Sequence, residues 1–192
     1  MRLLVGSLFC CIVAAILGLG VTWYSITRGA ALDALTIGAW KASPKSGTLD
    51  IDPYARASIA RSGRLPLGLG DGVSFVATTD DAGQPLDGRC DVVIAGTTPQ
   101  ARFWTLTLYD PDGQFIANSL NRQGFTSQEL IRKPDGTFEI TAAPRARPGN
   151  WLPTGGAERY MLALRLYDTP VGIATRSERE APMPIIKQGS CE

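Results

Sequence analysis

The sequence predicts a mainly β protein: an antiparallel β-sandwich or barrel with an N-terminal transmembrane helix and one short helix. Large and small residues alternate in strand-length segments, of which Arg102–Asp110 is the clearest. Turn signals rich in Gly, Pro and Asp separate such segments at intervals of about ten residues, which is typical of sandwiches. A long apolar run, Leu3–Thr27, precedes them.

The apolar run contains no charged residue and ends near Trp23 and Tyr24. About 20 apolar residues span a bilayer as a helix, and amphipathic aromatic rings suit the interface. The competing interpretation is a signal peptide cleaved after the small residues 29–31, but the apolar core of a signal peptide runs only about 7–15 residues. We therefore expect a transmembrane anchor over residues 1–28, a linker over 29–50 and a β-sandwich domain over 51–192.

Positive charge does not decide the orientation of this span, because Arg2 precedes it while Arg28, Lys41 and Lys45 follow it. A short N-terminus before a long C-terminal domain favours export of that domain. After Arg28 the chain has 17 basic and 18 acidic residues, a net charge of −1. A domain with this charge balance lacks the excess of basic residues that binding to nucleic acid or to anionic lipid requires.

The chain contains no histidine, which excludes Ser-His-Asp and Cys-His catalysis and every His-ligated metal site. Its four cysteines include Cys10 and Cys11 in the apolar run, which leaves too few thiolates for a four-cysteine zinc site. Gly68–Gly72 is followed by a strand pattern instead of a helix, so it indicates a turn and not a phosphate-binding loop. We expect neither a metal nor a cofactor.

Two helical segments are expected after the anchor. Ala30–Trp40 can extend the first helix beyond the membrane, before the break at residues 43–47. A short helix follows with Asp52 as its N-cap, Pro53 as its first residue, Tyr54–Ser62 as its body and Gly63 as its C-cap.

The strands follow in order. Val73–Thr78 and Cys90–Ala95 come first, and Arg102–Asp110 then forms a hairpin with Gln114–Ile116 across a turn at residues 110–113. A second hairpin joins Gln128–Arg132 to Thr137–Ala142; the alternative is a capping box at Thr126 and Glu129. Tyr160–Tyr167 is the last strand, Pro144–Gly156 is a long loop, and the tail after Asp168 is irregular. The expected core residues are Trp104, Leu106, Leu108, Phe138, Ile140, Leu162 and Leu164.

Four motifs resemble the bacterial domain-of-unknown-function family 1214 (DUF1214). They are ARFWTLTLYDPDGQFIAN (Ala101–Asn118), DGTFEI (Asp135–Ile140), GNWLPT (Gly149–Thr154) and YMLALRLYDTP (Tyr160–Pro170). The resemblance covers Cys90–Pro170 and implies a jelly-roll-like sandwich, with no established activity and no catalytic residues to carry over. A membrane segment stands where longer relatives have another domain, as in short anchored members. We therefore expect a single-pass protein of the bacterial inner membrane, with its domain on the periplasmic side.

The candidate binding residues lie in two segments predicted as loops. Asn150 and Trp151 sit in the Pro/Gly-rich loop, where the Trp ring can plug the open end of the sandwich or stack on a sugar or peptide. Asn118, Asn121 and Arg122 follow the central hairpin and can line the same end, or simply cap it. We predict no catalytic residue, because Asp110, Asp112 and Asp135 occupy turn positions that favour Asp structurally, and Lys133 is expected to be solvated.

Cys90 and Cys191 are the two cysteines outside the apolar run, so an exported domain has one possible intramolecular disulfide. The alternative is two free thiols. A bond would fasten the tail to the strand that Cys90 opens.

Two classes of function remain. The favoured one is a non-catalytic, envelope-facing binding or scaffold module whose partner is an envelope protein or a glycan, and not nucleic acid. The alternative is an exported hydrolase or lyase that acts through carboxylates on an envelope or carbohydrate substrate. A pocket of converging acidic groups would favour the enzyme, whereas a shallow aromatic surface would favour binding.

Overall fold

The computed structural model describes residues 2–28, 35–62, 67–68, 70–170 and 181–191. Within these residues, helices and strands alternate with short turns, including a 3-10 turn at Pro44–Gly47. The helices are α1 (Arg2–Arg28) and α2 (Pro53–Ser62). The strands are β1 (Leu35–Ile37), β2 (Trp40–Ala42), β3 (Gly72–Ala77), β4 (Cys90–Gly96), β5 (Phe103–Tyr109), β6 (Gly124–Thr126), β7 (Phe138–Ala143), β8 (Asn150–Pro153), β9 (Met161–Tyr167) and β10 (Ile185–Cys191).

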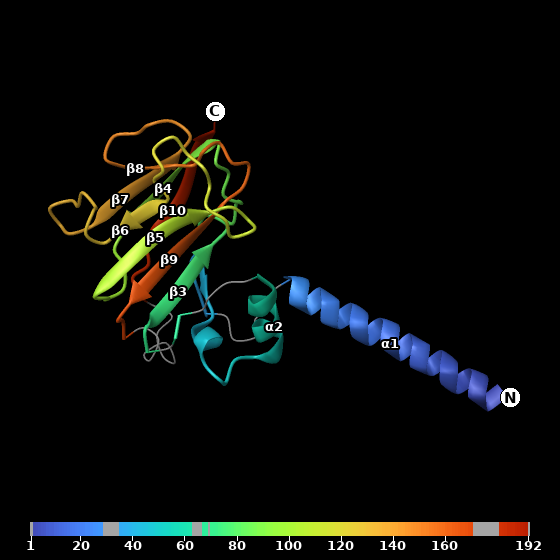
Figure 1. Ribbon diagram of the computed structural model, residues 1–192. Coiled ribbons are helices and arrows are strands. Elements are labelled where there is room, and N and C mark those ends of the chain that lie inside the picture. The colour runs from blue at the N-terminus through green and yellow to red at the C-terminus, as the bar shows by residue number, and fades with distance from the viewer. Residues whose placement is uncertain (1, 29–34, 63–66, 69, 171–180, 192) are drawn as a thin grey trace.

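The described strands form two sheets that pack into a sandwich (Figure 1). The larger sheet has the order β1-β2-β3-β9-β5-β6 and the smaller one β10-β4-β7-β8. The predicted mainly β, largely antiparallel fold is therefore confirmed. One pair departs from it, because β7 and β8 run parallel after the chain doubles back over residues 144–149.

The core lies between the inward faces of the two sheets. Alternate residues of β5 and β9 point into it and are almost fully buried. The Trp104 ring meets Phe138 of the opposite sheet, with ring centroids 5.1 Å apart. All of the predicted core residues are buried, with exposed fractions of 3% or less: Trp104, Leu106, Leu108, Phe138, Ile140, Leu162 and Leu164.

Neither predicted hairpin forms as a pair of strands. The turn after β5 closes through the Gly113 N–H and the Asp110 carbonyl at 3.0 Å, but the return segment makes only the bridge between Tyr109 and Phe115. β5 pairs instead with β9, over the full register from Phe103–Tyr167 to Tyr109–Met161, and with β6. β9 takes one edge of β5, and β6 takes most of the other edge at residues 105–107, so little of that second edge is left for the return segment.

The second predicted hairpin fails in the same way. Arg132 and Phe138 make a single bridge, and β7 pairs with β4. The contacts of the alternative capping box do form, since Glu129 Oε2 accepts from the Thr126 N–H at 3.2 Å, but they close a turn and not a helix.

The predicted helix over Ala30–Trp40 is wrong in its described part, where β1 and β2 form a hairpin within the segment expected to be a linker. Residues 29–34 lie outside the described part. Gly38 turns the hairpin at φ 56°, a conformation that suits glycine. Trp40 is 1% exposed and its Nε1 donates to the Pro184 carbonyl at 2.7 Å, so distant contacts override the local helical pattern.

Two further predictions are wrong for the same reason. The loop predicted over Pro144–Gly156 contains β8, and the tail predicted to be irregular ends in β10, which pairs with β4. Ile186 of β10 is fully buried. These short strands are determined by their neighbours more than by their own sequence pattern.

The first helix is long and apolar enough to cross a membrane. Its most apolar window has a mean hydropathy of 2.6 and is not buried against the rest of the protein. The predicted short helix is confirmed as α2, where Asp52 Oδ1 accepts from the Tyr54 and Ala55 N–H groups at 2.9 Å each. Gly63, its predicted C-cap, lies outside the described residues. Figure 1 shows α2 beside the C-terminal end of α1.

Candidate binding face

The outer face of the larger sheet carries the side chains that alternate with the core residues. On β5 these are Phe103, Thr105, Thr107 and Tyr109, all half-buried. In Figure 1 β5, β9 and β3 lie side by side on this face, as their register requires. The hydroxyl-bearing residues come between the two aromatic ends of the strand.

Aromatic pairs mark both ends of β5. Phe103 and Tyr167 lie with ring centroids 5.9 Å apart. At the other end Tyr109 stacks on Phe115 at 5.1 Å, and the Phe115 side chain is 60% exposed. Phe103 and Tyr109 are six residues apart, which is about 20 Å along a strand. The face thus has two apolar platforms separated by a polar stretch.

The backbone of Arg165 in β9 lies between these two platforms. It is in register with Thr105 and with Ser74 of β3. Its side chain extends past Ala163 to Tyr109, where Nη1 donates to the phenol oxygen at 3.0 Å and the guanidinium carbon lies 5.3 Å from the ring centroid. Among the described carboxylates, none forms an ion pair with Arg165. A guanidinium carries five N–H donors, and the phenol oxygen of Tyr109 takes one of them.

Three of the residues predicted as a site come together where the edges of the two sheets meet. Arg122 Nη1 donates to the Trp151 carbonyl at 3.0 Å, and the Arg122 guanidinium lies 5.3 Å from the Phe125 ring. The Asn118 side chain closes the loop between residues 118 and 122 through two hydrogen bonds. Its Oδ1 accepts from the Arg122 N–H at 3.0 Å, and its Nδ2 donates to the Arg122 carbonyl at 2.9 Å. These contacts tie β6 to β8.

The other two predicted residues differ in their surroundings. Asn121 is exposed, at φ 51°. Asn150 is 6% exposed and its amide is fully engaged: Oδ1 accepts from the Ile131 N–H, and Nδ2 donates to the carbonyls of Ile131 and Glu139, each at 2.8 Å. Trp151 lies in β8 and donates from Nε1 to the Ala143 carbonyl at 3.1 Å. A ligand-binding role for these five residues stays a prediction.

Two of the carboxylates considered for catalysis, Asp110 and Asp135, stabilise their own turns. Asp110 Oδ1 accepts from the Gln114 N–H at 2.8 Å. Asp135 accepts from the Thr137 hydroxyl and N–H, and the hydroxyl contact is the main cause that lowers the pKa of Asp135. Lys133, expected to be solvated, forms an exposed ion pair with Glu139 at 2.9 Å. The described residues contain no cluster of three or more His, Cys, Asp or Glu that could hold a metal ion.

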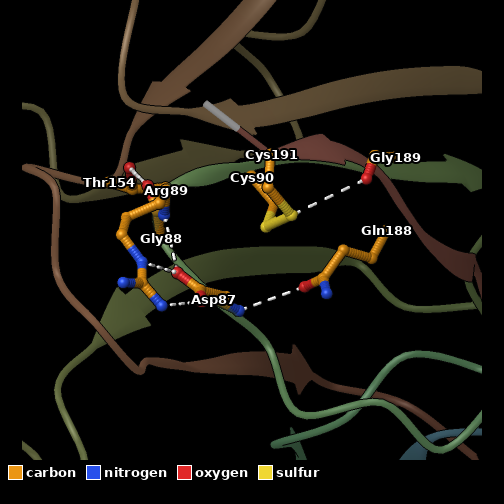
Figure 2. A network of polar contacts seen from close by, with 8 residues as sticks. All are labelled: Asp87, Gly88, Arg89, Cys90, Thr154, Gln188, Gly189 and Cys191. Carbon is orange, nitrogen blue, oxygen red and sulfur yellow. Dashed lines mark hydrogen bonds and ion pairs between the residues drawn. A yellow bond between two sulfur atoms is a disulfide. The ribbon is translucent and has the colours of Figure 1, made fainter.

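The end of the sandwich where β4 begins holds the predicted disulfide (Figure 2). Cys90 and Cys191 are bonded, which confirms that prediction and joins β4 to the end of β10. Beside them, Asp87 accepts from Arg89 Nη2 at 2.6 Å and from its Nε and backbone N–H at 2.9 Å each. These hydrogen bonds lower the pKa of Asp87 from 3.8 to about 2. The Asp87 N–H donates to Gln188 Oε1 at 3.1 Å, a second tie to β10.

Tyr160 at the same end has a buried hydroxyl with no hydrogen-bond partner in the described part of the chain. Burial raises the pKa of this phenol, and the nearby Asp87 charge adds to the effect. The Thr154 hydroxyl, by contrast, donates to the Gly88 carbonyl at 2.5 Å.

Sequence reasoning missed Arg165, Phe115 and Tyr167 as candidate binding residues. The signal in the sequence was the period-two alternation of the strands. Where one face of a strand is already apolar, aromatic residues at the alternate positions face solvent. Their convergence around one arginine depends on the pairing of β5 with β9, which no local pattern specifies.

A family model described as "Protein of unknown function (DUF1214)" matches residues 71–171. No curated protein matches the chain. Among solved structures, the VPA0106 protein from Vibrio parahaemolyticus is similar with a TM-score of 0.58 and 25% identity, over 73% of this chain and 36% of that one. An uncharacterized protein from Burkholderia cenocepacia has a TM-score of 0.44 and 16% identity, over 93% of this chain and 52% of that one. The chain thus spans little more than a third of the first structure. Neither the family description nor these names state an activity.

Proposed function

We propose that this chain, which belongs to the DUF1214 family, is a membrane-anchored binding module that holds an extended, carboxylate-bearing glycan on the outer face of its larger sheet. The observation that carries the proposal is Arg165, a cation without an acidic partner among the described residues, whose guanidinium lies against Tyr109 on a face that has an aromatic pair at each end of β5. The face is aromatic at both ends of β5, which favours binding over carboxylate catalysis.

The chemistry of the face suits a sugar polymer. Aromatic rings offer flat apolar area against which the C–H faces of sugar rings pack. A guanidinium fork makes charge-assisted, bidentate hydrogen bonds to a carboxylate. The hydroxyls of Ser74, Thr105 and Thr107 lie on the same face and both donate and accept, as sugar hydroxyls require. The length of β5 suits an extended ligand more than a compact one.

The anchor and the location of the domain are part of this proposal. The apolar α1 supports a single span, with the domain on the periplasmic side of the bacterial inner membrane. The Cys90–Cys191 disulfide supports an oxidising compartment, because such bonds are rare in the cytosol. Alkaline phosphatase fused after Glu192 should be active in cells. An inactive phosphatase, together with a fluorescent cytoplasmic reporter at the same position, would contradict export.

Binding can be tested with the full chain in lipid nanodiscs and two soluble probes. Alginate, a polyuronate, should bind, whereas neutral dextran should not. Arg165→Gln and Phe115→Ala should each weaken alginate binding about tenfold, the loss of roughly one charge-assisted hydrogen bond or one exposed aromatic platform. Lys187→Gln is the matched control, because it removes one exposed positive charge from β10 in the other sheet.

Two outcomes would overturn the glycan assignment. One is equal affinity of the parent and R165Q for alginate. The other is an absence of alginate binding together with a protein captured by a photoreactive residue at position 115. That second result would make the face a protein interface.

A further inference from the structure

We infer that residues 46–62, the membrane-proximal segment, contact lipid, and that the groove between their loop and α2 holds an acyl chain of the leaflet in which α1 ends. This inference rests on the anchoring part of the proposed function and concerns a site distinct from the binding face. It starts from where the segment lies relative to the end of the span.

The depth of the segment follows from one contact. The Arg61 guanidinium of α2 lies 4.5 Å from the ring centroid of Trp23 in α1. α1 has 27 residues, about 40 Å of helix, whereas the hydrocarbon core is about 30 Å thick. The last turns of α1 therefore extend into the interface, where Trp23 and Tyr24 are well placed as an aromatic belt. Arg61 keeps the end of α2 at that level.

The groove itself is lined mostly by apolar surface. Its volume is about 300 Å³. Arg56 Nη2 donates to the Leu49 carbonyl at 3.0 Å and so ties the loop to α2. The hydroxyls of Ser46 and Thr48 donate to the carbonyls of Ser43 and Lys45, so neither hydroxyl needs a hydrogen bond from a ligand. The groove is lined by Ser46, Thr48, Leu49, Ile51, Arg56, Ile59 and Ala60.

The exposed side chains of the segment point to lipid as the occupant. Leu49 is 93% exposed and Tyr54 is 42% exposed. Single exposed apolar residues are ordinary, but Leu49 lines an apolar groove, and both residues belong to the segment that contacts the end of α1. Arg56, with further N–H donors at the rim, suits a lipid phosphate while the chain lies in the groove. Continuity with the bilayer around α1 favours an acyl chain over a peptide or a second copy.

The first experiment measures the depth of Leu49. In a Cys10→Ser/Cys11→Ser background, Leu49→Cys is labelled with the fluorophore NBD, with the Cys90–Cys191 bond left oxidised. The full chain is placed in phosphatidylcholine nanodiscs with a doxyl group near the carboxyl end of the acyl chain. The label should lose most of its emission, because interfacial segments lie about 5–10 Å into the boundary between headgroups and chains. Ile131→Cys is the control, since Ile131 is 68% exposed in the segment between β6 and β7 and should keep its emission.

The second experiment tests the groove. A lipid with a diazirine on its acyl chain should cross-link to residues 46–62 of the full chain, and Ile59→Trp, which fills the groove, should lower the yield severalfold. The same emission at positions 49 and 131, without cross-links to this segment, would overturn the inference while the anchor stands. A chain that does not float with vesicles after a carbonate wash would overturn the anchor itself, and the inference with it. An unchanged helical circular dichroism signal shows that α2 still forms in Ile59→Trp.

Discussion

The central strands β5 and β9 and the peripheral strands β8 and β10 are held in the sandwich by different means. β5 and β9 share a register of seven residue pairs, and every inward side chain in that register is nearly fully buried. β8 has four residues, of which Leu152 is fully buried, and most of β10 is solvent-exposed apart from Ile186. Both peripheral strands also carry polar or covalent ties to other parts of the chain.

These ties are specific. Asn150 of β8 binds the backbone of Ile131 and Glu139. β10 is held by the disulfide and by Asp81, whose Oδ2 accepts from the Ile186 N–H at 2.6 Å. The other oxygen of Asp81 accepts from the Ala39 N–H at 3.0 Å, so one carboxylate joins the edges of the two sheets. Burial thus stabilises the centre of the sandwich, and long-range side-chain contacts fix its edges.

The largest effect should come from the centre. Leu106→Ala removes a side chain that is 1% exposed between the sheets and should cost about 2–5 kcal/mol in the free energy of unfolding. Guanidinium unfolding of the full chain in a mild detergent, followed by tryptophan fluorescence, measures it. Thr107→Ala, on the outward face of the same strand, is the control and should stay within about 0.5 kcal/mol. Equal costs would mean that burial does not separate the two faces.

The next effect comes from the covalent tie at the edge. Replacing Cys90 and Cys191 with Ser opens a loop closed over 101 residues. The chain-entropy model sets an upper value of about 4.7 kcal/mol, and we expect about 2–4 kcal/mol. Hydrogen exchange should show that the amides of β10 lose protection before those of β5. Uniform loss of protection in both strands would contradict separate stabilisation of the edge.

This contrast explains which parts of the fold could be predicted. The strands β3, β4, β5, β7 and β9 contain their own alternation, and each was predicted within a few residues. β1, β8 and β10 contain no such pattern. β10 pairs with a strand that is far away in sequence, as Ile186 does with Ile94, whereas β1 and β8 are short strands that pair with nearby ones. The disulfide was predictable by elimination, because it needed only a count of cysteines.

The residues of the candidate site were likewise predictable only where a local pattern marked them. Polarity and loop position selected Asn150, but its amide is fully used in holding β8. The sequence pattern did not single out Arg165, a charged residue within a predicted strand. Its importance depends on the register that places it beside Tyr109 and Thr105, and a single strand does not contain that information.

A smaller effect tests whether Asn150 stabilises the edge strand β8 or binds a ligand. Asn150→Ala leaves three backbone groups near Ile131 and Glu139 without partners and should cost about 1–3 kcal/mol in unfolding free energy. Alginate affinity at a temperature where the variant is folded should not change. Asn121→Gly is the control, since Asn121 is exposed at φ 51°, which glycine adopts readily. A loss of affinity without a loss of stability would reverse this assignment.

The smallest effect is expected at Tyr160, where the central strand β9 begins. Its hydroxyl is buried without a partner in the described part of the chain, an arrangement that costs about 1–3 kcal/mol relative to a satisfied group. Tyr160→Phe removes that cost but leaves a small void. At neutral pH the variant should therefore lie between unchanged and about 1 kcal/mol more stable than the parent, as measured by guanidinium unfolding.

Alkaline pH should enlarge this difference. Burial raises the pKa of Tyr160 above its ordinary value of 10.0, so the folded state keeps the phenol proton that the unfolded state loses above pH 10. The stability that this residue contributes is therefore fully present below pH 10 and falls as the pH rises further. A phenylalanine side chain does not titrate, so Y160F should lose less stability than the parent above pH 10, while the other tyrosines contribute equally to both. Parallel pH curves, or a destabilised variant at neutral pH, would mean that the hydroxyl has a partner and that β9 also depends on a polar tie.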